Sequence, residues 1–522
     1  MADILHKSSI LKKTIEVGSS TLMSRVLGII REGLMLTYLG AGAGSDIFFT
    51  AFKIPNSLRK IFAEGALSAA FVPTLVQVVR GQGRQQANNL MSLAFIIFEG
   101  LVLALCALVM FKTEATIALI APGWSADKVE LAVPLLRILM PFIFFLSSSA
   151  LLAGALQSVG HFFVPAFSPV LLNIIFITGL IVCWFYNLPV THLCFFILFG
   201  GAIQCIGHIA AYYKLHFSFG RPNLQALQQF GSVFSKFLLG SISLSIVEIN
   251  LFISTSFASY LPEGSISLIY YANRFMGIPL GVFAVAFSTI LLPHFSRICS
   301  YAPKRLSFYL LETTKFVFWV TIPATFMLSF FADKLFTTLF LSAKFNVQQA
   351  TEAGYILITF ALGLFFFSIN KILLNMYYAL HATWIPAVIS AVATVLNVGL
   401  NMAFISSLHA TRLAMAITIS GIVQTLLFVA MLKIKFNFKF YGAHFFIFVR
   451  RYLTQLALVI TGFSGLYWSI EMLIATWAPL TFKNFLLYKI GFWLWVGPLC
   501  GLAFLTLFYT RKLFKVTLYF LD

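Results

Sequence analysis

The sequence has few charged residues, and acidic residues are the scarcest. Of its 522 residues, 16 are Asp or Glu and 35 are Lys or Arg, so charged residues make up 10% of the chain. Soluble domains have about 25% charged residues, so this composition excludes an ordinary soluble fold. The chain is 60% hydrophobic with a mean hydropathy of +0.95, and long apolar runs recur from end to end. The sequence therefore predicts an all-α polytopic membrane protein.

Cysteine is also rare, and its spacing excludes two kinds of site. The six cysteines lie mostly in or beside apolar runs and form no CxxC pair. Neither a disulfide framework nor a zinc site is indicated, and we expect no firm metal site and no cofactor. The first apolar run does not resemble a cleavable signal peptide, because Arg25 and Arg31 interrupt it and no small-residue cleavage pattern follows it. We therefore expect this run to remain as a helix.

The apolar runs predict about 14 transmembrane helices. The expected spans are residues 15–40, 46–79, 88–112, 132–157, 164–186, 192–214, 231–260, 265–297, 312–333, 353–380, 384–406, 411–434, 449–475 and 485–510. With the N-terminus inside, twenty lysines and arginines fall on one side of the membrane and seven on the other. The positive-inside rule then places both termini in the cytoplasm. The net charge of +19 is spread over short loops, so we expect no nucleic-acid partner.

The chain contains an internal repeat with an offset of about 220 residues. VGSSTL at residues 17–22 resembles LGSISL at 239–244, and the prolines at 73 and 165 recur in similar contexts at 293 and 386. Parallel repeats of this kind commonly form two lobes around a central cavity and rock for alternating access. We therefore expect two pseudo-symmetric six-helix lobes, residues 1–220 and 221–440, and two additional helices in residues 441–522.

Charged residues gather in the first two expected spans. Arg25, Gly28 and Glu32 share one face of the first helix, and Arg31 lies close by. The second span carries Asp46, Lys53, Arg59, Lys60 and Glu64, and Arg274 lies in the eighth. A cation inside a membrane helix costs about 3 kcal/mol on insertion scales, so it normally faces water or a partner.

The excess of cations predicts a central cationic cavity that binds a multivalent anion. Guanidinium groups match phosphate oxygens bidentately and stay charged, so a diphosphate is a natural ligand. The competing interpretation is that some of these residues form structural ion pairs or reach to the membrane surface from helix ends. This alternative has most weight for Lys53, Lys60 and Glu64, where Lys60 and Glu64 are spaced as an i, i+4 pair.

Three segments carry a resemblance to a known family. They are SRVLGIIRE at 24–32, SDIFFTAFKIPNSLRKIFAEGALSAAFVP at 45–73, and YYANRFMGIPLGV at 270–282 followed by ILLP at 290–293. With these segments the chain resembles the MurJ (MviN) family of lipid II flippases, in the multidrug/oligosaccharidyl-lipid/polysaccharide exporter superfamily. The resemblance implies fourteen helices, in two six-helix lobes plus two C-terminal helices that shape a groove for a lipid tail. It also implies the bacterial inner membrane and a role in peptidoglycan biosynthesis.

The resemblance also implies roles for individual residues. Arginines matching Arg25, Arg31, Arg59 and Arg274 line the cavity in the family, and an acidic residue matching Asp46 is important there. We add Lys53 and Gly28 to this expected substrate-binding set. The chain departs from many relatives at Asn273 and Gly277, where carboxylates are frequent, so no gate or proton role is assigned to those positions.

Residues for ion coupling are less clearly indicated. Glu248 is a lone acid in the seventh span, and Asn397 and Asn401 are spaced i, i+4 in the eleventh. With Thr418 of the twelfth span, these amides offer oxygen ligands for a small hard cation. Amides in membrane helices more often form interhelical hydrogen bonds. The sequence leaves Na⁺, H⁺ and the membrane potential open as energy sources.

The leading hypothesis is therefore a flippase, not an enzyme, that moves lipid II to the outer leaflet. Its expected partners are lipid II, membrane lipids and cell-wall synthesis proteins. The alternative is an exporter of another lipid-linked oligosaccharide or of drugs, although cationic drugs require a cavity of the opposite charge. An intramembrane enzyme is disfavoured because the loops contain no nucleophile–base pair, metal-ligand cluster or DxD motif.

Overall fold

The computed structural model describes residues 7–521 except 65, 381, 383 and 405–408, and some helical side chains are not described. Within this range the chain is helical apart from turns and an isolated antiparallel bridge between Ser342 and Phe345. Helices are expected in lipid, because each backbone N–H finds its acceptor within the same segment. The all-α polytopic fold class is confirmed.

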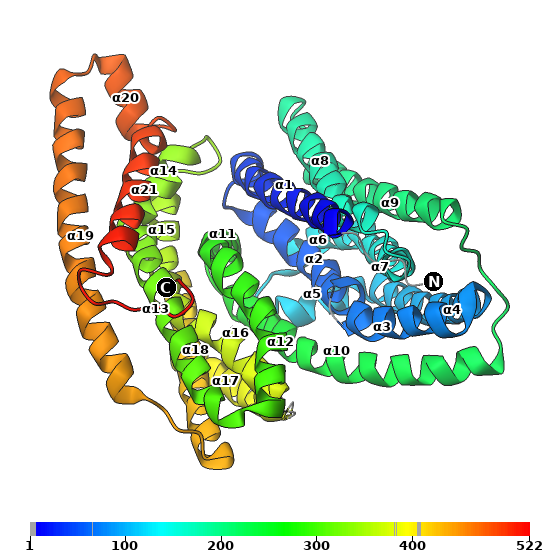
Figure 1. The fold of residues 1–522 in the computed structure, drawn as a ribbon. Helices are drawn as coiled ribbons and strands as arrows, with labels where there is room; N and C mark the ends of the chain where they lie inside the picture. Colours follow the sequence, from blue (N-terminus) through cyan, green and yellow to red (C-terminus); the bar gives the residue numbers. More distant parts are fainter. Residues whose placement is uncertain (1–6, 65, 381, 383, 405–408, 522) are drawn as a thin grey trace. The chain divides into compact units, whose positions relative to one another are not determined.

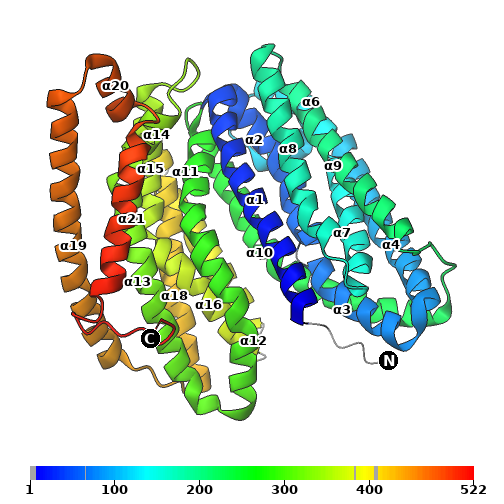
Figure 2. The same cartoon turned by 45° about the horizontal axis from the view of Figure 1, so that its top comes forward.

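The chain divides into two compact units, residues 1–267 and 268–522, which we call the N-terminal and C-terminal units. The chain passes from one to the other inside α11. In the N-terminal unit (blue to green in Figures 1 and 2), α1 lies along α8, and α10 packs against α3 and α4. Its helices are α1 (Lys7–Leu39), α2 (Ala43–Arg59), η1 (Lys60–Glu64), α3 (Ala66–Gly81), α4 (Gly83–Phe111), α5 (Thr113–Ile120), α6 (Ala126–Leu139), α7 (Phe142–Ser158), α8 (Phe163–Phe185), α9 (Val190–Lys214) and α10 (Leu224–Ala258).

The C-terminal unit begins within α11. In it α17 packs against α18, and α19 runs beside α21, with the short α20 joining their ends (Figure 2). Its helices are α11 (Ser265–Pro279), η2 (Leu280–Val285), α12 (Ala286–Tyr301), η3 (Pro303–Arg305), α13 (Leu306–Phe330), α14 (Ala332–Leu339), α15 (Val347–Leu362), α16 (Leu364–Ala379), α17 (Trp384–Ala403), α18 (Ala410–Phe436), α19 (Gly442–Trp477), α20 (Leu480–Tyr488) and α21 (Phe492–Thr510).

Helix order and length repeat along the chain. The series from α1 to α9 and the series from α10 to α18 present long, broken, long, short, broken, long and long helices in the same order. Both broken helices near the start of a series contain a π-helical turn, η1 or η2, with starting residues 220 positions apart. This agreement supports the predicted repeat. The compact units divide at residue 267 rather than at 220, because α10 packs against α3 and α4.

In the described part of the chain, nine helices are long and apolar enough to cross a membrane, or ten if the bent pair α15–α16 is one span. The four other expected spans correspond to α1, α2–η1–α3, α10 and α11–η2–α12. These segments hold every charged residue that the sequence assigns to the cavity. The predicted number of fourteen spans therefore stays a prediction.

Candidate substrate-binding site

The predicted face of α1 carries an exposed cation and a buried glycine without close neighbours. The Arg25 side chain is exposed, and among the residues that the structure describes no hydrogen bond or ion pair holds it. One turn further along, a Cβ atom added to Gly28 would meet no atom within 4 Å. Arg25 and Gly28 therefore combine an uncompensated guanidinium with free space beside the helix backbone.

Arg31 is held more tightly than the sequence predicts. Its Nη2 atom lies 2.6 Å from Glu32 Oε1, and its Nη1 donates to Asn173 Oδ1 on α8 at 2.9 Å. The guanidinium also lies over the Phe176 ring, 5.0 Å from its centroid, and the side chain is 16% exposed. Asn173 Nδ2 in turn donates to the Ser24 carbonyl at 3.1 Å. Glu32 thus offsets the charge of Arg31, and Asn173 fixes its position.

The Lys60 side chain pairs with another helix. Lys60 Nζ lies 2.8 Å from Glu248 Oε1, and Ser57 donates to the other Glu248 oxygen at 2.5 Å. Glu248 is 5% exposed, so its charge depends on these partners. The sequence suggested Glu64 as the partner of Lys60, but the Glu64 side chain lies outside the described atoms.

Lys53 is held by uncharged oxygen atoms of α10, and Arg59 has a partner on its own helix. Lys53 Nζ donates to the Leu251 carbonyl at 2.9 Å and to the Thr255 hydroxyl, both on α10. Arg59 Nε donates to Asn56 Oδ1 at 3.2 Å and has a further polar contact. The α2 side chains therefore fix α10 beside α2 while keeping a positive charge there.

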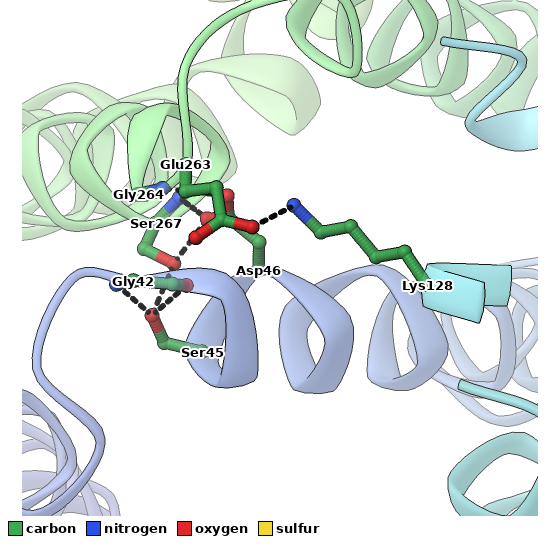
Figure 3. Close-up of polar contacts among 7 residues, drawn as sticks. All are labelled: Gly42, Ser45, Asp46, Lys128, Glu263, Gly264 and Ser267. Carbon is green, nitrogen blue, oxygen red and sulfur yellow. Dashed lines mark hydrogen bonds and ion pairs between the residues drawn. The ribbon is translucent and has the colours of Figure 1, made fainter. Parts of the chain in front are cut away.

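Asp46 is fully engaged in holding the start of α11 (Figure 3). Its Oδ2 accepts from the Gly264 N–H at 2.8 Å, and its Oδ1 accepts from the Ser267 N–H at 2.9 Å and the Ser267 hydroxyl at 2.6 Å. The carboxylate is 2% exposed. These N–H groups are the unsatisfied donors of a helix N-terminus, where a negative charge is stabilised by the helix dipole. In this conformation Asp46 acts as the cap of α11 rather than as a group facing a ligand.

The backbone at this cap requires glycine. Gly264 has φ +91°, and a Cβ atom there would lie 2.6 Å from the Ala41 carbonyl oxygen. Beside the cap, Lys128 Nζ lies 3.7 Å from Glu263 Oε1 (Figure 3). The turn before α11 is thus fitted closely against the turn before α2.

Arg274 is exposed on α11, belongs to the C-terminal unit and makes a contact of its own. Each unit is described by itself, so the expected convergence of Arg274 with Arg25, Arg31 and Arg59 stays a prediction.

The residues suggested for ion coupling fall into two groups. Glu248 binds Lys60 and Ser57 in the N-terminal unit. Asn401 Nδ2 donates to Asn397 Oδ1 at 3.0 Å in the C-terminal unit, and both amides are fully buried. Thr418 Oγ1 donates to the Thr359 carbonyl at 3.0 Å. Asn401 Oδ1 is a buried acceptor without a donor among the described residues, so the pair retains one oxygen suited to a cation. The described residues include no group of three His, Cys, Asp or Glu side chains that fits a metal ion.

An apolar cavity of about 170 Å³ lies between α13, α19 and α21. Val320, Met327, Val459, Phe463 and Leu507 are among the side chains that line it. Its lining is almost entirely carbon, which suits an acyl or polyprenyl chain and excludes a polar ligand.

Sequence reasoning missed several of the residues that build this site. Glu32 was placed on one face with Arg25 but was not paired with Arg31, and Asn173 is an isolated amide in an otherwise apolar span, so both signals were present in the sequence. Ser267 and Thr255 carried no such signal, because serine and threonine are frequent in membrane helices. Their roles depend on contacts across about 200 residues.

Comparisons with known proteins identify the family of this chain. A family profile described as "Lipid II flippase MurJ" matches residues 35–488. The chain belongs to the MurJ family. A Haemophilus influenzae relative named "Probable lipid II flippase MurJ" is 33% identical over 400 residues, which cover 73% of this chain and 78% of the relative. The "Lipid II flippase MurJ" of Burkholderia cenocepacia is 31% identical, with 80% of this chain and 83% of the relative covered.

Solved structures lead to the same family and a wider fold group. A structure titled "Lipid II flippase MurJ, inward closed conformation" matches with a TM-score of 0.76 at 26% identity, covering 96% of this chain and 99% of the other. An inward-facing MATE family transporter of the MOP superfamily matches with a TM-score of 0.67 at 16% identity, covering 81% and 98%. The MATE match shows a shared fold. Together the matches make this MurJ family member a multi-span membrane transporter.

Proposed function

We propose that this chain is a flippase that carries lipid II, the lipid-linked peptidoglycan precursor, from the cytoplasmic to the outer leaflet by alternating access. Membership of the MurJ family supports the substrate. The observation that carries the mechanism is the uncompensated cation on α1, because the exposed Arg25 guanidinium needs a counter-ion from outside the described chain. The diphosphate of lipid II supplies such a counter-ion.

Under this proposal the cations have unequal roles. Arg25, Arg59, Lys53 and Arg274 bind the diphosphate and sugar head group. Among them, Arg25 is exposed and held by no described side chain, and Lys53 is held by uncharged oxygen atoms. Arg31 contributes a guanidinium whose orientation Glu32 and Asn173 hold. Gly28 leaves room for the head group beside α1. Asp46 positions α11, which carries Arg274.

The polyprenyl tail stays in lipid and lies along the two C-terminal helices. The apolar cavity between α13, α19 and α21 supports this arrangement, because it offers carbon surface without polar groups. Under this proposal, residues 441–522 form the groove for the lipid tail. The two repeats, residues 1–220 and 221–440, bind the head group.

The energy source under this proposal is a cation or the membrane potential. One charge that crosses 100 mV is worth about 2.3 kcal/mol, and an inside-negative potential draws an empty cationic carrier back toward the cytoplasm. Asn397, Asn401 and Thr418 are the residues that we assign to a Na⁺ site, while Glu248 is assigned to the Lys60 ion pair. The protein lies in the bacterial inner membrane with both termini cytoplasmic, where cell-wall synthesis proteins are its natural neighbours.

A second candidate within the same fold group is export of another lipid-linked oligosaccharide. The cationic α1 and α2 suit any polyprenyl diphosphate, and they disfavour cationic drugs. Both candidate functions are transport, so the lipid is released without covalent change in either case.

The test is transfer of labelled lipid II between leaflets in proteoliposomes under imposed Na⁺, H⁺ or electrical gradients. We expect the Arg25→Ala/Arg274→Ala variant to lose transfer at least tenfold, because two diphosphate ligands are gone. Arg221→Ala, which removes an exposed loop cation, is the matched control and should transfer at the rate of the unaltered protein. Equal transfer by the double variant would remove these arginines from the mechanism, and preference for another lipid-linked oligosaccharide would favour the second candidate.

A further inference from the structure

A carboxyl group that the proposed mechanism does not use lies deep in the membrane part of the N-terminal unit. Glu99 belongs to α4, a candidate membrane span, and its residue is 3% exposed. At 1.5 Å per residue, it lies about 24 Å from the start of this helix and about 18 Å from its end. Glu99 is therefore near the middle of the bilayer.

The surroundings of this carboxyl are too poor in donors to hold a negative charge. The Ser147 hydroxyl on α7 donates to Oε2 at 2.8 Å. The other oxygen, Oε1, is buried and has no hydrogen-bond partner of good geometry among the described residues, although the buried Ser148 hydroxyl lies close enough to interact with the carboxyl. No described ion pair involves Glu99.

The helices packed on α4 place no cation beside Glu99 among the described residues. Two thiols, Cys106 on α4 and Cys205 on α9, lie near the carboxyl, and buried His208 is one turn beyond Cys205 with its Nδ1 beside the Gln204 carbonyl at 2.9 Å. No charged or titratable residue occurs on α7. The other helices packed on α4 carry four charged residues. Arg80 on α3, Glu114 on α5 and Lys236 on α10 are exposed. Glu248 on α10 is paired with Lys60.

A carboxylate at this depth is costly. An ionised group without a counter-charge in apolar surroundings takes up a proton rather than remaining charged. The neutral acid needs a single acceptor for its proton, and the Ser147 and Ser148 oxygens supply candidates.

The second repeat shows that the fold does not need an acid here. The corresponding depth of α13, residues 318–322, reads Phe-Trp-Val-Thr-Ile and contains no carboxyl. The helices of the second repeat thus pack without an acid at this depth, so Glu99 in the first repeat is not explained by helix packing.

We propose that Glu99 is a proton-binding site of the N-terminal unit, protonated in the described conformation and deprotonated during the transport cycle. On release the carboxyl O–H bond breaks, the electron pair stays on the carboxylate, and the proton passes to water. This coupling role rests on the proposed flippase function, but the proton on Glu99 is measurable without transport.

The first experiment detects the proton directly. Infrared spectra of the protein in proteoliposomes should contain a protonated-carboxyl C=O band at neutral pH that Glu99→Gln removes. Glu114→Gln, at an exposed acid of the same unit, should leave that band unchanged. A spectrum in which Glu99→Gln removes only carboxylate absorption would overturn the proposal whether or not the protein moves lipid II.

The second experiment asks whether the proton is used. Lipid II transfer is followed across a pH series at constant membrane potential. We expect the rate of the unaltered protein and of Glu114→Gln to change with pH, and the rate of Glu99→Gln, which mimics the protonated acid, to lose this dependence. If Glu99→Gln keeps the pH profile of the unaltered protein, the proton on Glu99 stays bound throughout the cycle, and the coupling role is overturned.

Failure of the proposed function gives a different result. If the unaltered protein moves no lipid II at any pH, the flippase proposal fails and coupling falls with it, while the infrared band still decides the protonation of Glu99. If Glu99→Gln does not accumulate, Glu99→Asp replaces it in both measurements. The infrared band should then shift rather than disappear, and the pH profile of transfer should shift rather than flatten; an unshifted pH profile would overturn the coupling role.

Discussion

At the residue scale, the cations of the first two spans differ in how completely their charge is offset. Arg31 and Lys60 each have a carboxylate partner, Glu32 and Glu248. Arg25 has no described partner, and Lys53 has uncharged ones. The positive character of the N-terminal unit therefore depends on fewer residues than the sequence suggests.

Gly28 offers a direct test of the open face of α1. Gly28 is buried, but an added Cβ meets no atom within 4 Å, and leucine favours a helix by about 0.5–1 kcal/mol over glycine, so we expect Gly28→Leu to fold. Lipid II transfer should nevertheless fall several-fold, since the side chain fills space that we assign to the head group. Gly18→Leu, also on α1 with open space around it, is the control for both thermal unfolding and transfer. Normal transfer by Gly28→Leu would place the head group elsewhere.

The Lys60–Glu248 pair predicts a coupling between two substitutions. Lys60→Met should destabilise the protein by about 1–2 kcal/mol, because Glu248 stays buried without its cation while Lys60 itself is partly exposed. Adding Glu248→Gln should recover most of this loss. Thermal unfolding of the two single variants and the double variant in detergent measures the coupling, and strictly additive shifts in Tm would contradict it.

At the scale of elements, α11 begins on a cap supplied by α2. The Asp46 carboxylate accepts two backbone N–H groups at this helix start, a task that a residue of the same turn usually performs. The close approach of Gly264 to Ala41 makes the two turns dependent on each other. Two π-helical turns, η1 and η2, follow in the same two helical segments, and such turns frequently mark functional positions.

The cap can be tested by a change that keeps its shape. Asp46→Asn should destabilise the protein by about 1–3 kcal/mol, because one oxygen acceptor becomes a donor facing an N–H group. Ser267→Ala should cost less, since the backbone hydrogen bonds remain. Hydrogen exchange at the amides of residues 264–267 should accelerate in Asp46→Asn and stay slow in Ser45→Ala. Unchanged exchange in Asp46→Asn would show that Asp46 is not the cap.

At the scale of the whole molecule, charge asymmetry predicts the orientation in the membrane. The twenty lysines and arginines on one side and seven on the other predict cytoplasmic termini. The units of the fold each keep their own apolar core, and the chain crosses from one to the other within a single helix, α11.

Orientation can be measured with two exposed loop residues. In intact cells, a membrane-impermeant maleimide should label Lys344→Cys and should label Arg221→Cys only after the membrane is permeabilised. Four of the six native cysteines are buried, which keeps background labelling low. Labelling of Arg221→Cys in intact cells would reverse the predicted orientation.

The sequence alone determined the helical membrane fold, the family and the charged character of the first spans. Hydropathy and charge distribution are properties of composition and local order, so they can be read without coordinates. The periodicity of α1 also placed Arg25, Gly28 and Glu32 on one face, because a helix has a fixed number of residues per turn.

Only the tertiary structure decided which charges are offset and which carboxyls act as caps. Glu248 meets Lys60 across 188 residues, and Ser267 meets Asp46 across 221. It also decided that Glu99 is buried beside two serine hydroxyls, which a lone acid in a long apolar helix does not reveal. Pairing depends on which helix faces pack together, and many packings are compatible with the same apolar runs.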